Sequence, residues 1–277
     1  MKDDLEEKVF QANIRYHSAL AQTYDAKQSH FLPENQIRVE GILANLAAKT
    51  GGGSLLDLGC GTGFIINLAK KYFKRIVGVD ITQDMISQVE MVGSQVELYK
   101  ADTKDLSFLM TDTFDVCTAY GFLHHLFDMQ PTLRESFRLL RSGGIYYSDQ
   151  DPNYYYWRLM KDLRGQEDLS EILRKEIRSV VDISEDISTA TGLSPEMVSL
   201  AEFQKVKQGG LEADTVVAIL KGIGFTSIQY RYEWFLGEGK VFHQQSQEDT
   251  LVIETYLRRI LPATRHLFKY ISFYVEK

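Results

Sequence analysis

Apolar residues near the N-terminus recur at the spacing of a helix. Five of them share one face over residues 5–24: Val9, Ala12, Tyr16, Leu20 and Tyr24. Pro33 is typical of a first helical position, and the pattern that follows it ends before the glycines at 51–53. We therefore predict two helices within residues 1–50.

Short apolar runs then alternate with helical patterns. Strands are expected at 54–58, 76–80, 96–101, 114–119 and 145–149, with helices starting after Gly63 and Thr82 and near Pro131. This alternation predicts an α/β fold with a doubly wound, mostly parallel sheet that carries helices on both faces.

The pattern changes after residue 150. Residues 151–209 contain no convincing strand, but apolar residues recur helically, and Ser194-Pro195-Glu196 is typical of a helix start. An insertion of about 60 residues between sheet elements is usually functional, so we expect a helical lid. A helix at 213–221, a strand at 227–235, a helix at 248–260 and an edge or hairpin strand at 266–275 should follow.

The bulk composition narrows the class of protein. The 277 residues are 44% hydrophobic and 25% charged, as in ordinary globular proteins, and the net charge of −7 argues against a nucleic-acid partner. The two cysteines, Cys60 and Cys117, exclude a disulfide scaffold. The charged first residues do not resemble a secretory signal, and no apolar run reaches about 20 residues. We expect a cytoplasmic protein without a membrane segment.

The most informative segment is Leu55–Ala69, LLDLGCGTGFIINLA. It predicts a buried strand, a glycine turn that lets the backbone approach a ligand, and a helix N-terminus with free N–H groups. The next strand ends in Asp80. A glycine turn after one strand and an acid after the next is how open α/β sheets hold a nucleoside.

The residues of the turn indicate which kind of nucleoside-containing ligand it would bind. Phe64 occupies the third glycine position of a dinucleotide fingerprint, and no Gly-Lys-Ser or Gly-Lys-Thr ends a phosphate loop. The run DLGCGTG instead resembles motif I of the class I S-adenosylmethionine-dependent methyltransferases. Residues 114–126 and 139–144 resemble that family's fourth strand and the glycine turn before its fifth, and the resemblance covers about residues 35–150.

The resemblance implies a Rossmann-like fold of seven strands, the last of them antiparallel, and a small-molecule methyltransferase. It also implies S-adenosylmethionine as cofactor and S-adenosylhomocysteine as product. We divide the chain into N-terminal helices over the cofactor site (1–50), a core (51–150 and 210–277) and a helical lid or substrate insertion (151–209).

Three acids are the main cofactor candidates. Asp80 should accept hydrogen bonds from the ribose hydroxyls, although it could merely cap the helix after Thr82. By resemblance, Asp57 reads the ammonium group or braces the glycine turn, and Asp102 accepts from the adenine amine or caps locally.

Other cofactor candidates come from the turn, the strand ends and the N-terminal helix. The turn and strand-end candidates are Gly59, Cys60, Gly61, Thr62, Gly63, Ile81, Met85, Ala101, Thr103, Ala119, Tyr120 and Gly121. Cys60 and Thr62 should serve turn geometry rather than reactivity. Tyr16 and Tyr24 could close over the sulfonium or pack on the sheet.

His124 and His125 follow the fourth expected strand and are the catalytic candidates. A neutral imidazole there could take a proton from an acceptor hydroxyl or amine, or it could simply support the loop. His17, His30 and His243 are weaker alternatives. No metal is expected, because no ligand spacing is evident and adjacent side chains should point in different directions.

Aromatic residues flank the insertion. Tyr154–Trp157 and the alternating Tyr230, Tyr232 and Trp234 could line an apolar acceptor pocket or attach the insertion to the sheet.

The expected activity is therefore methyl transfer to an O or N atom of a small-molecule acceptor. A tRNA- or protein-modifying enzyme is an alternative, but the basic residues of the insertion alternate with acids. A non-catalytic cofactor-binding module is another. The sequence does not indicate the oligomeric state.

Overall fold

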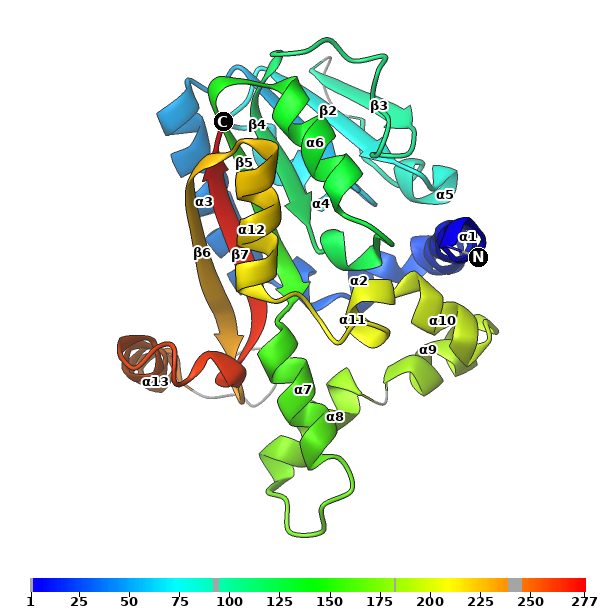
Figure 1. Cartoon of the computed structure of the whole chain (residues 1–277), viewed down its shortest axis with the longest axis vertical. Helices are drawn as coiled ribbons and strands as arrows, with labels where there is room; N and C mark the ends of the chain where they lie inside the picture. The colour runs from blue at the N-terminus through cyan, green and yellow to red at the C-terminus, as the bar shows by residue number, and fades with distance from the viewer. Residues whose placement is uncertain (1, 92–94, 182, 239–245) are drawn as a thin grey trace.

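A computed structural model describes residues 2–91, 95–181, 183–238 and 246–277, which fold around one seven-stranded sheet (Figure 1). The strand order is β3-β2-β1-β4-β5-β7-β6. The strands are β1 Ser54–Leu58, β2 Arg75–Asp80, β3 Val96–Lys100, β4 Phe114–Tyr120, β5 Leu140–Pro152, β6 Thr226–Phe235 and β7 Phe268–Glu276. The first five are mutually parallel, whereas β7 is antiparallel to β5 and β6. The expected α/β sheet with an antiparallel seventh strand is confirmed.

Helices cover both faces of the sheet. Those outside residues 151–209 are α1 Lys2–Leu20, α2 Tyr24–Lys27, α3 Pro33–Thr50, α4 Phe64–Ala69, α5 Gln83–Ile86, α6 Gln130–Leu139, α12 Ala213–Ile223 and α13 Gln247–Arg259. Short 3-10 turns are η1 Ala21–Thr23, η2 Ser29–Phe31, η3 Leu123–His125 and η4 Arg265–Leu267. In Figure 1, α6 and α12 lie in front of the sheet and α3 lies behind it.

The two faces follow from the alternation of side chains along each strand. Leu56 of β1 packs in a core with α6 and α12, while its neighbour Leu55 packs in a second core with α3 and α4. Successive strand side chains point to opposite faces, so a strand buried on both sides reads as a continuous apolar run. This is why β1 and β4 were readily predicted.

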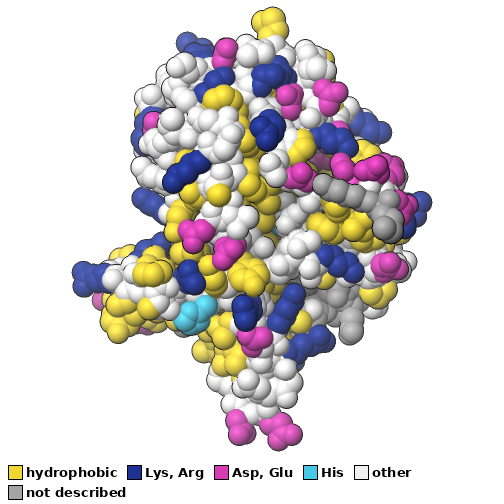
Figure 2. Space-filling view, in the orientation of Figure 1, with side chains coloured by type: hydrophobic (Ala, Val, Ile, Leu, Met, Phe, Trp, Pro, Cys, Tyr) yellow, Lys and Arg dark blue, Asp and Glu magenta, His cyan; other side chains and the backbone are white. Residues whose placement is uncertain are grey.

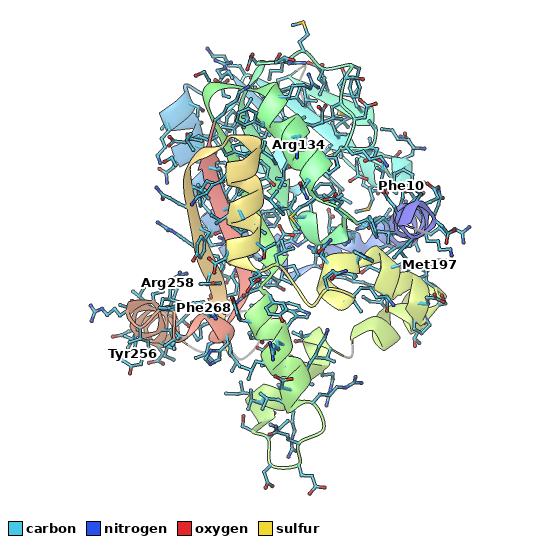
Figure 3. The ribbon with its side chains drawn as sticks, viewed as in Figure 1. Phe10, Arg134, Met197, Tyr256, Arg258 and Phe268 are labelled. Atoms are coloured by element: carbon cyan, nitrogen blue, oxygen red, sulfur yellow. The ribbon has the colours of Figure 1, made fainter. Side chains whose placement is uncertain are left out.

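Residues 154–206 form a group of helices beyond the carboxyl ends of β4 and β5 (Figure 1). They are α7 Tyr154–Leu163, α8 Glu171–Val180, α9 Ile183–Thr191, α10 Pro195–Ala201 and α11 Phe203–Val206. Helix α10 packs along α1, and Phe10 and Met197 mark these two neighbours in Figure 3. Residues 154–206 thus connect α1 with the carboxyl ends of β4 and β5.

Two strand predictions needed correction. The last strand, β7, is not at the edge: it lies between β5 and β6, and β6 is the outer strand. Both faces of β7 are covered, so Phe268, Ile271 and Phe273 are fully buried. Strand β5 is also longer than 145–149, because its start at Leu140 pairs with Phe114.

Helix α13 stands away from the sheet. It exposes Leu251, Val252 and Tyr256 by 65%, 65% and 63%, and Figure 2 shows apolar side chains over it. Arg258 attaches it, with the guanidinium carbon 5.2 Å from the centroid of the Phe268 ring (Figure 3) and a 2.9 Å ion pair to Glu233. Among the described residues, none of the helices combines the length and the apolar content that crossing a membrane requires.

Candidate active site

A cleft opens at the carboxyl ends of β1, β2 and β4, between the glycine turn and α1. It contains about 890 Å³ of empty space, open solvent included. We call it the cofactor cleft. Ten of the seventeen cofactor candidates line it: Tyr24, Gly59, Gly61, Asp80, Ile81, Met85, Asp102, Thr103, Tyr120 and Gly121. Helix α1 adds residues that the sequence did not single out, among them Phe10 and Asn13.

The glycine turn requires glycine for two reasons. Gly59 has φ +67° and Gly61 has φ +51°, a region that side chains disfavour. A Cβ on Gly59 would also overlap the ring of Phe122. The turn is fixed by Gly59 N and Cys60 N, which both donate to the Val79 carbonyl of β2. The backbone therefore forms the floor of the cleft.

Asp80 both lines the cleft and braces the turn. Its Oδ2 accepts from Gly61 N at 3.0 Å and its Oδ1 from Thr82 N at 2.8 Å. A carboxylate has about four acceptor sites, so lone pairs remain for a ligand. The capping role and the proposed ribose role are compatible.

Asp57 lies behind the cleft wall. It is buried and accepts from the Thr118 hydroxyl at 2.8 Å. Burial raises its pKa to about 7, and the nearby Asp80 charge adds to this against the Thr118 hydrogen bond. Asp57 therefore does not line the cleft itself. It supports the cleft wall from behind, through β1 and β4.

Six further candidates do not line the cleft. They are Tyr16, Cys60, Thr62, Gly63, Ala101 and Ala119. Cys60 is buried in the core with α3 and α4, and Thr62 donates to Asp25 Oδ1 at 2.6 Å, which ties α2 to the turn. The positions of Cys60 and Thr62 support the glycine turn, as we expected for these two residues.

Asp102 sits at the far end of the cleft, after β3. Its Oδ1 accepts from Lys104 N at 3.1 Å, and its Oδ2 lies 3.3 Å from Lys104 Nζ. Its side chain is partly exposed, so it caps the local turn and still faces the cleft.

A second cavity, which we call the adjoining cavity, meets the cofactor cleft. The two share His17, Tyr24, Gly121 and His125. The remaining polar lining comes from distant parts of the chain: Tyr16, Gln28, His30, His124, Gln150, Glu202, Lys205 and Tyr270. The cofactor cleft and this cavity form one continuous site.

The two candidate histidines lie in η3, with ring centroids 4.0 Å apart. His124 Nδ1 is 2.9 Å from Asp151 Oδ1, and His125 Nδ1 donates to the Ala201 carbonyl at 2.7 Å. The expectation that they point in different directions was wrong, because these partners draw both rings to the same cavity. Burial lowers the pKa of His124 to about 4 and that of His125 well below its usual range, so both are neutral.

Sequence reasoning missed Glu202. Its Oε1 accepts from the Tyr16 hydroxyl at 3.2 Å, while its Oε2 is 2.9 Å from Lys205 Nζ and 3.6 Å from His124 Nε2. Burial would raise the pKa of Glu202, but the charge and hydrogen bond of Lys205 and the two nearby histidines together outweigh burial and hold the pKa low. Only the packing of α10 and α11 brings this carboxylate to the histidines.

Gln150 was also missed. It is 7% exposed with φ +63°, a backbone region that non-glycine residues seldom adopt. Its Nε2 lines the adjoining cavity and has no hydrogen-bond partner within the described residues. No sequence signal marks such a residue.

The aromatic residues around the insertion serve packing. Tyr156 and Trp157 form a core with Ile177 and Val180 of α8, and Tyr232 stacks on Phe268 with centroids 6.2 Å apart. None of Tyr154–Trp157, Tyr230, Tyr232 and Trp234 lines either cavity. Of the weaker histidine candidates, His17 and His30 line the adjoining cavity, and His243 lies outside the described residues.

Known proteins resemble this chain in sequence and fold. A family profile described as a methyltransferase domain matches residues 56–148. A ubiquinone biosynthesis O-methyltransferase of Pseudomonas fluorescens is 28% identical over 182 residues, which cover 59% of this chain and 77% of that protein.

Solved structures share the fold at lower identity. A S-adenosylmethionine-dependent methyltransferase from Mesorhizobium loti has a TM-score of 0.54 at 16% identity and covers 91% of this chain and 100% of that one. One from Archaeoglobus fulgidus has a TM-score of 0.53 at 18% identity, with 87% and 94% covered. With the glycine turn, the acids and the strand order in place, residues 56–148 form a methyltransferase domain, and the chain is similar in sequence and fold to S-adenosylmethionine-dependent methyltransferases.

Proposed function

We propose that this enzyme transfers a methyl group from S-adenosylmethionine to an oxygen or nitrogen atom of a small molecule bound in the adjoining cavity. The observation that carries the proposal is the continuity of the two cavities at Gly121 and His125. A methyl acceptor in one cavity would lie next to a donor in the other.

The cleft residues fit the cofactor. Asp80 would hold the ribose, Asp102 would accept from the adenine amine, and Ile81 and Met85 would pack on the base. A hydrogen bond to a charged group contributes about 1.5–3 kcal/mol. The fit is supported by Gly61, which lines the cleft without a side chain and leaves its backbone open to a close approach. When bound, the cofactor supplies an activated methyl group, and the protein positions its acceptor.

His125 is the stronger of the two candidate proton acceptors. Its Nδ1 donates to the Ala201 carbonyl, which leaves the lone pair on Nε2, and its ring borders both cavities. It would accept the proton that an acceptor hydroxyl or amine loses. His124, beside Asp151, lines only the adjoining cavity and is the second candidate.

The lining favours a polar acceptor over the apolar or ring-like one expected from the aromatic segments. Gln150 and Lys205 offer donors, and Glu202 offers an acceptor. A hydroxyl acceptor agrees with the O-methyltransferase named above.

Surface charge supports a small molecule rather than RNA or protein as the acceptor. Basic and acidic side chains are mixed on the face shown in Figure 2. Within the insertion, Lys175 pairs with Glu171 at 2.9 Å. Cys60 and Cys117 are buried free thiols, which supports the proposed reducing, cytoplasmic compartment.

Calorimetry and a turnover screen test the proposal. Both S-adenosylmethionine and S-adenosylhomocysteine should bind, and a panel of hydroxyl- and amine-bearing metabolites should yield S-adenosylhomocysteine. His125→Ala should lower turnover by about 10²–10⁴-fold with cofactor affinity unchanged. The exposed His266 provides the matched control, since His266→Ala should leave both unchanged.

Three outcomes would contradict parts of the proposal. Cofactor binding without turnover on any acceptor would indicate a non-catalytic binding module. Full turnover in both His125→Ala and His124→Ala would show that catalysis is positional only. Steeply salt-dependent RNA binding would favour a nucleic-acid acceptor.

A further inference from the structure

We propose that His124, His125 and Glu202 form a binding site for a divalent transition-metal ion, with Zn²⁺ the best chemical match, in the wall of the adjoining cavity. The proposal rests on the arrangement of these side chains and does not depend on which acceptor the enzyme uses.

The three side chains already lie close together. Each offers one ligand atom, and these atoms are all within 4.8 Å of one another. His124 Nε2 is 3.6 Å from Glu202 Oε2. Two ligands at about 2.0–2.1 Å from a tetrahedral zinc ion lie about 3.4 Å apart, so little rearrangement is needed.

Each ligand is oriented by a second partner. Asp151 Oδ1 lies 2.9 Å from His124 Nδ1, the Ala201 carbonyl accepts from His125 Nδ1 at 2.7 Å, and the Tyr16 hydroxyl donates to Glu202 Oε1 at 3.2 Å. Metal-ligating histidines almost always donate their other ring N–H to a carboxylate or a backbone carbonyl.

Three protein ligands leave a coordination position open to the cavity. Two histidines and one glutamate with a free fourth position are typical of catalytic zinc sites. An acceptor hydroxyl at that position would be polarised by the ion and would lose its proton more readily to solvent; in the metal-bound enzyme the ion would thus replace His125, whose Nε2 is then a ligand, as the group that activates the acceptor. The site would thus orient the acceptor beside the cofactor cleft, which His125 also lines.

The Lys205 ammonium group would compete with the metal ion for the Glu202 carboxylate. Its Nζ is 2.9 Å from Glu202 Oε2, the same oxygen that would bind the ion. The Lys205 side chain is 17% exposed and lines the adjoining cavity, so it has room to move. The carboxylate can therefore pair with the ammonium group or with a metal ion, but not with both at full strength.

Titration of the chelator-treated full chain with Zn²⁺ tests the proposal, with Co²⁺ absorption as a second probe of tetrahedral coordination. One equivalent should bind. His124→Ala and Glu202→Gln should each weaken binding by at least 100-fold, and Asp151→Asn by about 10–100-fold. Lys205→Met should tighten binding several-fold, because it removes the competing cation. His266→Ala, at an exposed histidine outside both cavities, should leave the zinc affinity unchanged.

Binding of S-adenosylhomocysteine to each variant serves as the folding control and separates this test from the proposed function. Zinc binding weaker than about 1 mM would overturn the assignment. Equal affinity in wild type, His124→Ala and Glu202→Gln would also overturn it. Unchanged affinity in Lys205→Met would exclude Glu202 Oε2 as a ligand.

Discussion

The cofactor cleft and the adjoining cavity are built in opposite ways. Most of the cleft comes from the ends of β1, β2, β3 and β4 and the turns after them, and helices, chiefly α1, supply the rest of the lining. The cavity draws one or two residues each from α1, η3, β5, α11 and β7. The first site is a property of local turns in an open sheet, whereas the second depends on how the helices of 154–206 dock.

The docking rests on a few buried polar contacts. Glu176 of α8 pairs with Lys269 of β7, with the two side chains 1% and 2% exposed. Asn153 donates to the carbonyls of Arg265 and Phe268, both at 2.7 Å. Mutations at these contacts should affect the cavity and spare the cleft.

The largest effect is expected at Lys269. Lys269→Met removes one partner of the buried ion pair with Glu176, so the free energy of unfolding should fall by about 3–5 kcal/mol. Chemical denaturation measures this, and Lys175→Met, at an exposed pair, should be neutral. Turnover should fall while S-adenosylhomocysteine binding persists. Equal loss of both would break the distinction between the two sites.

Asp57 should make the cleft side sensitive to pH. Its pKa is about 7 in the folded state, above the unfolded value of 3.8, so the folded state holds the proton more tightly. Stability from this group is therefore lost as pH rises from about 4 to 7, by about 2–3 kcal/mol between pH 5 and 8. Asp57→Asn should remove that loss, as measured by unfolding at both pH values. If Asp57→Asn showed the same pH dependence of stability as the wild type, the raised pKa of Asp57 would be contradicted. Asp162→Asn, at an exposed acid of α7, is the control.

Asp80→Ala tests the cleft directly. Loss of the carboxylate should weaken binding of S-adenosylmethionine by about 1.5–3 kcal/mol, because a charged acceptor of the ribose hydroxyls is removed. Calorimetry measures the affinity, and Asp84→Ala, an exposed acid nearby, should bind normally. If Asp80→Ala bound S-adenosylmethionine as tightly as the wild type, Asp80 would not bind the ribose and would only brace Gly61 and Thr82.

The smallest effect is expected at the start of α8. The Ser170 hydroxyl accepts from Leu173 N at 3.3 Å and caps the helix, so Ser170→Ala should cost about 1 kcal/mol. Thermal unfolding measures the change. Ser179→Ala, inside the same helix, should be near neutral, since alanine is the best helix former. A neutral Ser170→Ala would indicate that docking, not the cap, determines the stability of α8.

The sheet and the cleft were predictable because their signals are local. Gly59 and Asp80 stand at strand ends that alternation had already defined, and they line the cleft as expected. The exact contacts were not predictable: Asp57 lies behind the wall, because its carboxylate bonds to Thr118, sixty-one positions along the chain.

The sequence by itself determined where most strands lie, the glycine turn, and the acids at the end of β2 and after β3. Strand periodicity and positive-φ glycines depend on neighbouring residues, so a local pattern is enough to predict them. Only the tertiary structure decided that β7 is interior, that both histidines face one cavity, and that Glu202 and Gln150 join them. Those outcomes depend on burial between segments far apart in the chain, such as His125 and Ala201, 76 positions apart. No local pattern encodes which distant polar group a buried side chain will meet.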